Sequence, residues 1–274
     1  MLRAMLHLAA LAAAAQPGDV QDLTELSIEE LLQVEVTSVS RKEQAVADSP
    51  AAIHVITQED IRRSGHTSIP ELLRMVPGVH VARIDAHSWM VTVRGFGHRF
   101  TDKLLVMIDG RTVYTNLFSG VFWDVQEIPL EEIERIEVIR GPGGTMWGAN
   151  AVNGVINIIT KSSKDTQGFL GHVQGGDEDR ALATARYGAA MGESAWWRAW
   201  VHGFDRDSFE DPAGGQASDE WAMARAGVRF DWEAGGRDSF TVEGDLYDGR
   251  GQSAFPLLST QPPFALAIDE TFEF

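Results

Sequence analysis

The stretch IPLEEIERIEVIRGPGGTMWGANAVNGVINIITK, residues 128–161, decides the fold. It contains two runs rich in isoleucine and valine, Ile133–Arg140 and Val152–Thr160, and such residues favour strands. The segment Gly141-Pro142-Gly143-Gly144 separates the runs, and glycine and proline are typical of turns. We therefore predict two strands of a compact domain, joined by a glycine-rich loop.

Working outward from these strands, we predict that residues 50–161 form one α+β domain with a small mixed sheet and short helices. Strand Ile53–Thr57 leads into a helix that opens at Thr57-Gln58-Glu59-Asp60 and closes at Gly65. A second helix starts at Ser68, and the proline in its first turn costs no hydrogen bond. Further short strands are predicted at Val79–Arg83, Met90–Gly95, Leu104–Ile108 and Arg111–Tyr114, the last two joined by a hairpin turn.

From Gly168 onward the pattern changes to a long alternation of apolar and polar residues. In Ser239–Asp248 the even positions carry Phe, Val, Gly and Leu, while the odd positions carry mostly polar residues. Strands of about ten residues are long enough to cross a bilayer at a tilt. We predict such strands at Ala181–Ala190, Ala195–Phe204, Trp221–Trp232 and Ser239–Asp248.

The links between these strands alternate in length, as they do in outer-membrane barrels, where short periplasmic turns alternate with longer extracellular loops. Met191–Ser194 and Ala234–Arg237 are short, whereas Asp205–Glu220 and the segment from Gly249 onward are long. Five of the eight tryptophans lie in this region, as an interfacial girdle would require. A soluble β-sandwich also alternates and stays open as an alternative.

The composition narrows the class of protein. The chain has 274 residues and a net charge of −17, from 23 basic and 40 acidic side chains. This balance argues against nucleic-acid binding, which needs clustered Lys and Arg. There is no cysteine, so disulfides and thiolate metal sites are excluded, and no apolar stretch reaches the 18 residues of a membrane-spanning helix. The eight histidines show no pair at helical metal spacing, and we expect no metal site.

Residues 1–15 are predicted to be a signal peptide. Arg3 is followed by an apolar, Ala-rich stretch that ends in a small-residue cleavage site, Ala13-Ala14-Ala15. A short buried helix is the alternative. Residues 16–49 are predicted to be a periplasmic N-terminal segment, in which Ser27-Ile28-Glu29-Glu30 matches a helix capping box.

Four ordered motifs resemble the plug domain of TonB-dependent outer-membrane receptors. They are LLRMVPGV at residues 72–79, VRGFG at 93–97, LVMIDGR at 105–111 and the opening stretch at 128–161. No single motif is decisive, but the ordered set is specific and covers nearly all of residues 50–161. Residues 168–274 resemble the family only in pattern. The resemblance implies a plug inside a 22-stranded barrel, of which residues 168–274 would be the first five or so antiparallel strands.

The resemblance also implies a function. In this family a scarce ligand binds the extracellular face of a receptor in the outer membrane of a Gram-negative bacterium. The partner TonB, energised by the inner membrane, then pulls the plug so that the ligand passes. We therefore expect an uptake receptor that contacts outer-membrane lipid, performs no catalysis and needs no cofactor. Its expected ligand is a ferric siderophore, and cobalamin is the next candidate.

The TonB-contacting segment of the family is short and extended, with acidic, Thr and Val residues. The best match is the run of Glu35, Val36, Thr37, Ser38, Val39 and Ser40. Its β-branched residues suit the addition of a strand to the edge of a partner's sheet. The alternative is that this run is simply the first strand of the plug.

Arg94 and Arg140 match two plug arginines that pair with barrel glutamates in the family. A guanidinium inside a lumen needs a carboxylate, because a buried unpaired charge costs several kcal/mol. The family's partners lie late in the barrel, beyond residue 274, so we expect both arginines to lack them in this chain. Exposed surface arginines are the alternative.

Ligand contacts are expected from two plug loops at the extracellular apex, Asp85–Trp89 and Asn116–Trp123. The candidate residues are Asp85, His87, Trp89, Asn116, Phe118, Phe122 and Trp123. Their aromatic rings would stack on a catecholate siderophore or a corrin, or would equally pack against barrel loops.

The length of the chain raises an alternative. About 105 residues follow the plug, whereas 22 strands of about ten residues need several hundred. Five strands would leave two open edges that lipid cannot satisfy. We therefore expect a piece of a longer receptor, and we keep as the alternative a truncated or decayed fragment that acts as a soluble plug-like binding module.

Overall fold

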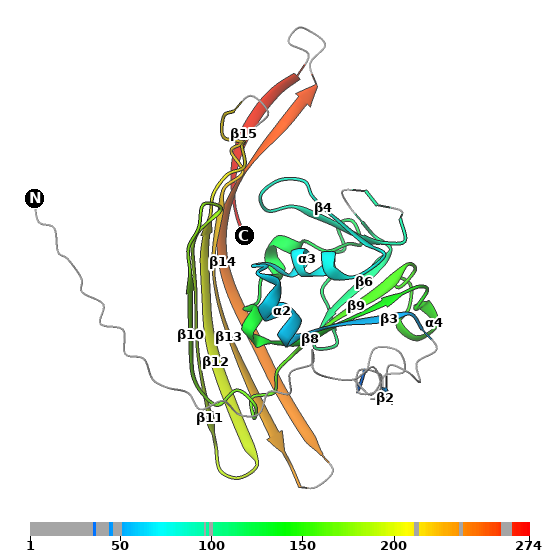
Figure 1. Ribbon diagram of the computed structural model, residues 1–274, viewed down its shortest axis with the longest axis vertical. Coiled ribbons are helices and arrows are strands. Elements are labelled where there is room, and N and C mark those ends of the chain that lie inside the picture. The colour runs from blue at the N-terminus through cyan, green and yellow to red at the C-terminus, as the bar shows by residue number, and fades with distance from the viewer. Residues whose placement is uncertain are drawn as a thin grey trace, which may run out of the picture.

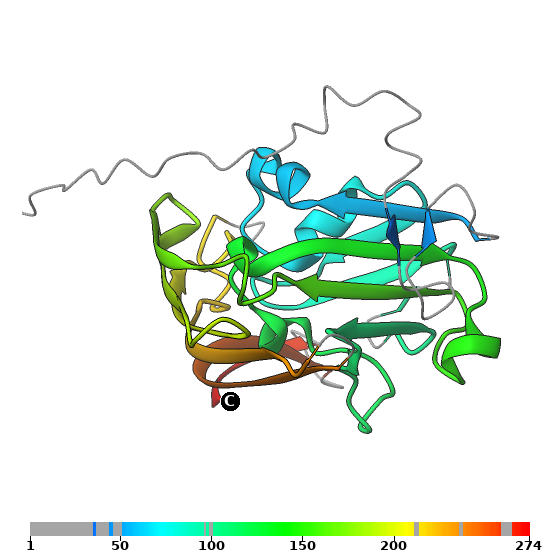
Figure 2. The same cartoon turned by 90° about the horizontal axis from the view of Figure 1, so that it is seen from below.

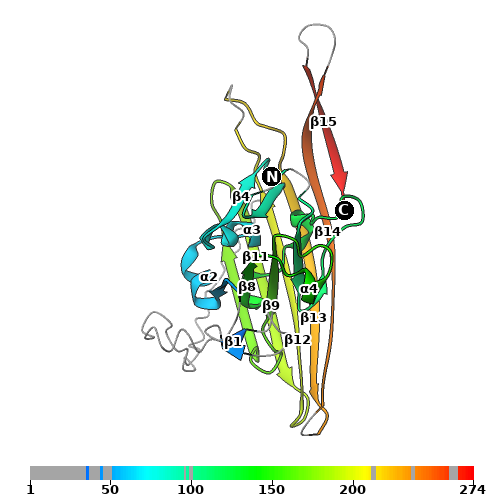
Figure 3. The ribbon, with the colours of Figure 1, turned by 90° about the vertical axis from the view of Figure 1, so that its right-hand side faces the viewer.

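The computed structural model describes residues 35–36, 44–45, 51–95, 97–98, 101–210, 214–235, 238–258 and 265–274. They form two parts: a plug with a five-stranded sheet, and a long curved sheet of six antiparallel strands. The plug lies against the concave face of the curved sheet, as two perpendicular views show (Figures 1 and 2). Seen from its own side, the plug covers the middle of that face (Figure 3).

The plug sheet is mixed, as predicted. Its strand order is β3-β8-β9-β6-β7, where β6 and β9 are parallel and the other pairs are antiparallel. The strands are β3 Ile53–Thr57, β6 Leu104–Ile108, β7 Arg111–Thr112, β8 Ile133–Arg140 and β9 Gly154–Thr160. The two runs of the opening stretch are therefore neighbouring strands, with Val138 opposite Ile156. Their buried positions supply most of the sheet's contribution to the core.

Short helices cover one face of this sheet. Helix α2, Gln58–Ser64, opens with a complete capping box between Thr57 and Asp60 and ends at Gly65, whose φ is 72°. Helix α3, Ile69–Leu72, continues into the 3₁₀ turn η2, Leu73–Met75. The remaining elements of the plug are β4 Val79–Arg83, β5 Trp89–Val93, η3 Trp123–Gln126, η4 Leu130–Glu132 and α4 Gly144–Trp147. Apart from the plug, β1 Glu35–Val36 pairs with β2 Gln44–Ala45.

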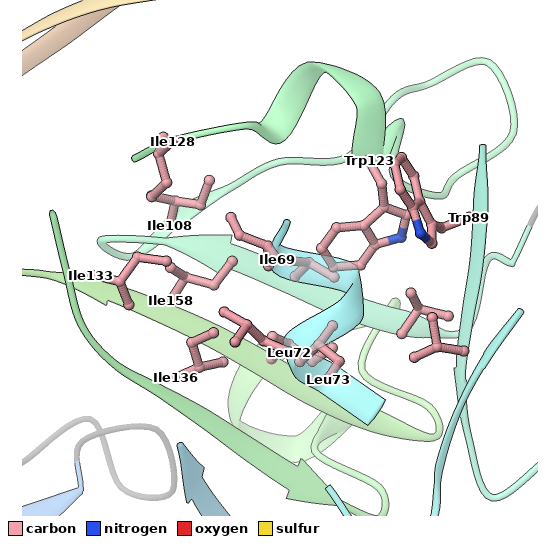
Figure 4. Close-up of a cluster of buried hydrophobic side chains, with 14 of the residues drawn as sticks. Ile69, Leu72, Leu73, Trp89, Ile108, Trp123, Ile128, Ile133, Ile136 and Ile158 are labelled. Atoms are coloured by element: carbon pink, nitrogen blue, oxygen red, sulfur yellow. The ribbon is translucent and has the colours of Figure 1, made fainter. Parts of the chain in front are cut away.

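The main core lies between the helices and the sheet (Figure 4). It is built from isoleucines of β6, β8 and β9, leucines of α3 and η2, and two indoles. Its labelled members are Ile69, Leu72, Leu73, Trp89, Ile108, Trp123, Ile128, Ile133, Ile136 and Ile158. Burying one such side chain contributes about 1.5–3 kcal/mol. A smaller cluster around Leu105, Ile139 and Val155 covers the other face of the sheet.

The curved sheet follows chain order, with each strand paired to the next. Its strands are β10 Gly168–Gln174, β11 Asp179–Ala190, β12 Ala195–Arg206, β13 Trp221–Glu233, β14 Ser239–Leu258 and β15 Ala265–Glu273. The expectation of a long loop from Gly249 onward is wrong, because β14 spans 20 residues, continues to Leu258 and pairs with a sixth strand. The apolar alternation stops at Asp248, but backbone pairing with β15 needs no such alternation.

Rows of apolar side chains lie on the face of the curved sheet away from the plug. Large hydrophobic side chains exposed there include Phe169, Val173, Val201, Val228, Val242 and Leu246. The concave face buries polar ones, among them Thr184, Arg186, Arg198, His202, Arg206 and Arg225. On the same concave face, the side chains that join the core of the plug are Leu182, Trp200, Phe204, Trp221 and Met223. This distribution is the reverse of a soluble sandwich and is typical of a barrel wall in lipid.

Aromatic pairs lie on the outer face near the short links. Trp232 stacks on Phe240 with ring centroids 5.6 Å apart, and Tyr187 lies 5.9 Å from Trp197. Two of the tryptophans expected in this girdle, Trp200 and Trp221, are instead buried on the concave side. Among the described residues, no helix is long and apolar enough to cross a membrane.

We predict that Ile156→Ala lowers the free energy of unfolding of the full chain by about 2–5 kcal/mol. Ile156 is fully buried on β9, the strand that joins β8 to β6, so the substitution leaves a cavity in the centre of the plug. Chemical denaturation in detergent measures the effect. Val152→Ala, at a half-exposed side chain in the loop before β9, should change the free energy of unfolding by no more than about 0.5 kcal/mol. Equal effects of the two substitutions would contradict the fold.

Candidate functional site

A pocket of about 340 Å³ lies between the plug loops, the upper half of β14 and the C-terminal end of β15. Five of the seven predicted apex residues line it: His87, Trp89, Phe118, Phe122 and Trp123. Asp85 lies just behind the pocket, where its carboxylate accepts hydrogen bonds from the backbone N–H groups of His87 and Ser88 at 3.1 and 2.7 Å. Asn116 is exposed and does not line the pocket.

The pocket residues differ in solvent exposure, and therefore in how accessible they are to a ligand. Trp89 and Trp123 belong to the plug core and are each only 6% exposed (Figure 4). The indole N–H of Trp89 donates to Glu71 at 2.8 Å. Phe122 is 41% exposed and meets Phe118 edge to face, with ring centroids 5.0 Å apart. Phe118 and Phe122 therefore provide the accessible aromatic surface.

His87 joins the plug loop to the curved sheet. Its Nε2 lies 3.0 Å from the carbonyl oxygen of Gln252 and 3.0 Å from the hydroxyl of Ser253, both on β14. Its ring also meets Phe272 of β15 edge to face at 5.1 Å. The imidazole is thus fixed by partners more than 160 residues away in the chain.

The pocket residues on the curved sheet were missed by the sequence analysis, namely Ser253, Phe272 and Phe274. Phe272 lies in β15, the last strand of the chain, and Phe274 directly follows it. A sixth strand predicted there would have been the only sequence signal for these two residues. Ser253 lies in the part of β14 that was expected to be a loop. Asp124 of η3 was also missed, and it adds a carboxyl to the pocket wall. Burial raises the pKa of Asp124, and His87 partly opposes that rise.

Below the pocket, plug carboxylates face arginines of the curved sheet. Glu132 lies 3.1 Å from Nη1 of Arg186 and 2.8 Å from Nε of Arg198. Glu127 lies 3.2 Å from Arg206, which also pairs with Asp179 at 2.7 Å. Burial raises the pKa of Glu127, and the Arg206 guanidinium opposes the rise. These pairs join plug and sheet at buried positions.

The hydroxyl of Thr160, at the end of β9, forms hydrogen bonds with both the plug and the curved sheet. Asp109, in the predicted hairpin turn with a φ of 47°, accepts the backbone N–H and the hydroxyl of Thr160 at 2.9 and 2.8 Å. The same hydroxyl accepts hydrogen bonds from Arg198 at 3.1 Å and Arg229 at 2.9 Å. The hairpin motif thus fixes the end of β9, where the plug chain leaves for β10.

The two plug arginines that were expected to pair with barrel glutamates, Arg94 and Arg140, have no carboxylate partner among the described residues. Arg94 is exposed with a φ of 59°, and its backbone N–H donates to Gly78 at 3.2 Å. Arg140 is partly buried and donates to the carbonyl of Pro77 at 2.9 Å. Both therefore lie at one turn, and within the described part of the chain neither forms an ion pair. Pairing with glutamates beyond residue 274 stays a prediction.

The predicted TonB-contacting segment is only partly described. Glu35 and Val36 form β1, in antiparallel register with Ala45 and Gln44. Thr37, Ser38, Val39 and Ser40 lie outside the described residues, as does the predicted signal peptide. No group of three or more metal-binding side chains occurs in the described ranges.

A small mixed-sheet domain against the polar face of an outward-apolar sheet is the arrangement of a plugged outer-membrane barrel. Residues 45–155 match the family model described as the TonB-dependent receptor plug domain. The vitamin B12 transporter BtuB of Vibrio vulnificus is 35% identical over 137 residues, which are 49% of this chain and 22% of that protein. The ferric enterobactin receptor PirA of Pseudomonas aeruginosa is 27% identical over 259 residues, 80% of this chain and 34% of that protein.

A solved structure supports the fold. The pyoverdine outer membrane receptor FpvA of Pseudomonas aeruginosa PAO1 aligns with a TM-score of 0.65 and 21% identity, over 82% of this chain and 32% of that one. The chain thus carries the plug domain of a TonB-dependent receptor, followed by antiparallel strands that resemble the start of the barrel. These matches span about a fifth to a third of each relative's length.

We predict that Asp124→Asn raises the thermal unfolding temperature of the full chain at neutral pH. The folded state holds the Asp124 proton more tightly than the unfolded chain does. Its ionisation therefore costs stability as pH rises from about 4, the ordinary pKa of Asp, through the raised pKa. The asparagine variant avoids this cost, and its advantage should vanish below about pH 4.

Thermal scans in detergent from about pH 3 to pH 8 measure this difference. Asp102→Asn is the matched control. The hydrogen bond from Lys103 lowers the pKa of the partly exposed Asp102 carboxyl, so removing this carboxyl should not raise the unfolding temperature at neutral pH. An Asp124→Asn variant that unfolds at or below the temperature of the unaltered chain at every pH would contradict the prediction.

Proposed function

We propose that this chain is the plug and first barrel strands of a receptor that takes up a scarce ligand across the outer membrane of a Gram-negative bacterium, driven by TonB. The observation that carries the proposal is the combination of an apolar outer face with a plug held on the polar inner face. A soluble binding module would have no use for exposed Phe, Val and Leu side chains in rows along its strands.

The orientation follows from the links between strands. The short links after β11 and β13 lie at one end of the sheet, and outer-membrane barrels keep their short turns in the periplasm. The aromatic pairs of the outer face lie at this same end. The upper part of β14 lies at the opposite end of the sheet from the short links (Figure 1). The pocket residues Ser253 and Phe272 belong to β14 and β15, so the pocket would face the cell exterior.

A ferric siderophore is the proposed ligand, and cobalamin is the next candidate. The pocket combines accessible rings of Phe118 and Phe122 with a few polar groups, which is the usual composition of a small-molecule site. Relatives are named for vitamin B12 and for ferric enterobactin, and both kinds of ligand have large planar or aromatic parts. The receptor would bind and pass its ligand without covalent chemistry.

TonB is the proposed partner at the other end of the chain. We propose residues 35–40 as its contact, within a periplasmic segment of residues 16–49 that follows a signal peptide of residues 1–15. The extended backbone of β1 and its edge-to-edge pairing with β2 support strand addition as the mode of binding. In this division residues 50–161 are the plug, and residues 168–274 are the beginning of the barrel.

We predict that Phe122→Ala weakens ligand binding to the full chain in detergent by about tenfold, because a buried aromatic contact contributes 1 kcal/mol or more. The probes are ferric enterobactin, ferric pyoverdine and cyanocobalamin, measured by isothermal titration. Tyr114→Ala is the matched control, because Tyr114 is also 41% exposed but lies outside the pocket. Equal losses in both variants, or binding of none of the probes, would count against the proposed site.

We predict that Val36→Pro abolishes binding of the chain to the periplasmic domain of TonB, whereas Val36→Ala retains it. Proline removes the backbone N–H that strand addition requires, while alanine keeps it. Pull-down with the purified TonB domain measures both variants. Binding that survives Val36→Pro would move the contact elsewhere.

Cell fractionation tests the location of the native product. Antibodies against residues 50–161 should detect it in the outer membrane. Detection only in the periplasm would favour the soluble binding module instead.

A further inference from the structure

We propose that Arg186 and Arg198 form an oxyanion-binding site that the Glu132 carboxylate occupies when the plug is seated, and that a carboxylate or similar oxyanion of the transported ligand competes for it. The identity of that ligand rests on the proposed function, but the binding site itself does not.

The first observation is the burial of this cluster. Glu132 is 1% exposed, Arg198 is 2% exposed and Arg186 is 9% exposed. Glu132 comes from the plug, whereas the two arginines come from β11 and β12 of the sheet. A buried guanidinium without an anion is strongly destabilising. Any movement that removes Glu132 would therefore favour the binding of another anion at the two arginines.

The second observation is that, among the described residues, Arg186 and Arg198 form no ion pair with a carboxylate of the curved sheet itself. Arg206, Arg225 and Arg229 each have a carboxylate of the sheet itself within ion-pair distance, namely Asp179, Asp245 and Asp231. For Arg186 and Arg198, the ion pairs found in the described ranges are those to Glu132. Displacement of the plug therefore leaves these two arginines, among the five, without a carboxylate partner.

The third observation is that one carboxylate satisfies the two arginines poorly. Although Arg198 Nε lies 2.8 Å from Glu132 Oε2, neither atom has a hydrogen bond of good geometry among the described residues, and Arg186 Nε also lacks one. A guanidinium prefers two parallel bonds to a carboxylate. Lys161 adds positive charge, and burial together with Arg186 lowers its pKa. A free oxyanion could align better than the tethered one.

The fourth observation is space. A cavity of about 330 Å³ between plug and sheet is lined by Glu132 and Arg198 but not by Arg186. Its other charged lining residues are Arg111, Arg225 and Arg229, with the carboxylates Asp109, Glu243 and Asp245. At about 30 Å³ for each water, it has room for roughly ten waters or for a small carboxylic acid. An oxyanion can therefore approach Arg198 while the plug is seated, and Arg186 becomes accessible when Glu132 leaves. Exchange of one anion for another would release the plug's ion pair while the two arginines keep an anionic partner.

Chemical rescue of Glu132→Ala tests the site in the full chain in detergent. The variant should unfold at a lower temperature than the unaltered chain, and acetate or citrate should raise that temperature saturably, because a ligand that binds only the folded state stabilises it. Potassium chloride at the same ionic strength is the salt control. The unaltered chain should show a smaller rise at the same concentrations, since the added anion must first displace Glu132.

Glu131→Ala is the matched variant. Glu131 is the neighbouring carboxylate, and it pairs with His172 instead of an arginine. Its unfolding temperature should respond to acetate or citrate no more than that of the unaltered chain does. Equal responses of the two variants, an equal effect of chloride, or no response of Glu132→Ala would overturn the proposal.

If Glu132→Ala fails to fold, Glu132→Gln keeps the side-chain volume and removes the charge. Citrate should bind this variant in isothermal titration, and adding Arg198→Gln should abolish the binding. Absence of citrate binding to a folded Glu132→Gln chain would overturn the proposal. Failure of the uptake function would instead appear in the ligand and TonB measurements, and it would leave the rescue result unchanged.

Discussion

The pairing of plug carboxylates with buried arginines is the constraint on which the rest of this structure depends. The curved sheet places Arg186, Arg198 and Arg206 on its concave face, because its other face is apolar. Such arginines cannot remain buried without anions, and Glu127 and Glu132 supply them from the plug. The plug therefore supplies the counter-charges of the buried arginines and also packs against the concave face of the sheet. Neither part would keep this arrangement of charges without the other.

Much of the fold could be predicted because local signals agree with it. The capping box at Thr57, the turn at Asp109-Gly110 and the isoleucine runs of residues 128–161 each form the element expected of them. The strand alternation also separated an apolar from a polar face, and the apolar positions Phe240, Val242 and Leu246 of β14 are exposed. What local signals could not give was the extent of β14, since its upper half is paired by β15 through the backbone, with no apolar pattern to mark it.

The candidate site was predictable in part for the same reason. Loop positions in the plug identified His87, Phe118 and Phe122, but not the β14 and β15 residues that complete the pocket from more than 100 residues away. The sequence also suggested that arginines of the plug would meet glutamates of the barrel. Among the described residues, the buried ion pairs between plug and sheet have the opposite polarity, with acids on the plug and arginines on the sheet. The more exposed pairs Arg83–Glu178 and Arg111–Asp245 have the arginine on the plug. Only the register of β11 to β13 places the arginines of the sheet in one layer.

The length of β14 has a consequence for what the cell presents to its surroundings. Twenty residues at about 3.3 Å each extend roughly 66 Å, more than twice the hydrocarbon thickness of about 30 Å. Even at a tilt of about 45°, the strand rises well above the lipid on the side of the pocket. The β14–β15 hairpin projects beyond plug and neighbouring strands (Figure 1). In a cell envelope, this projecting ribbon would be the first part of the chain that antibodies or other large molecules in the medium encounter.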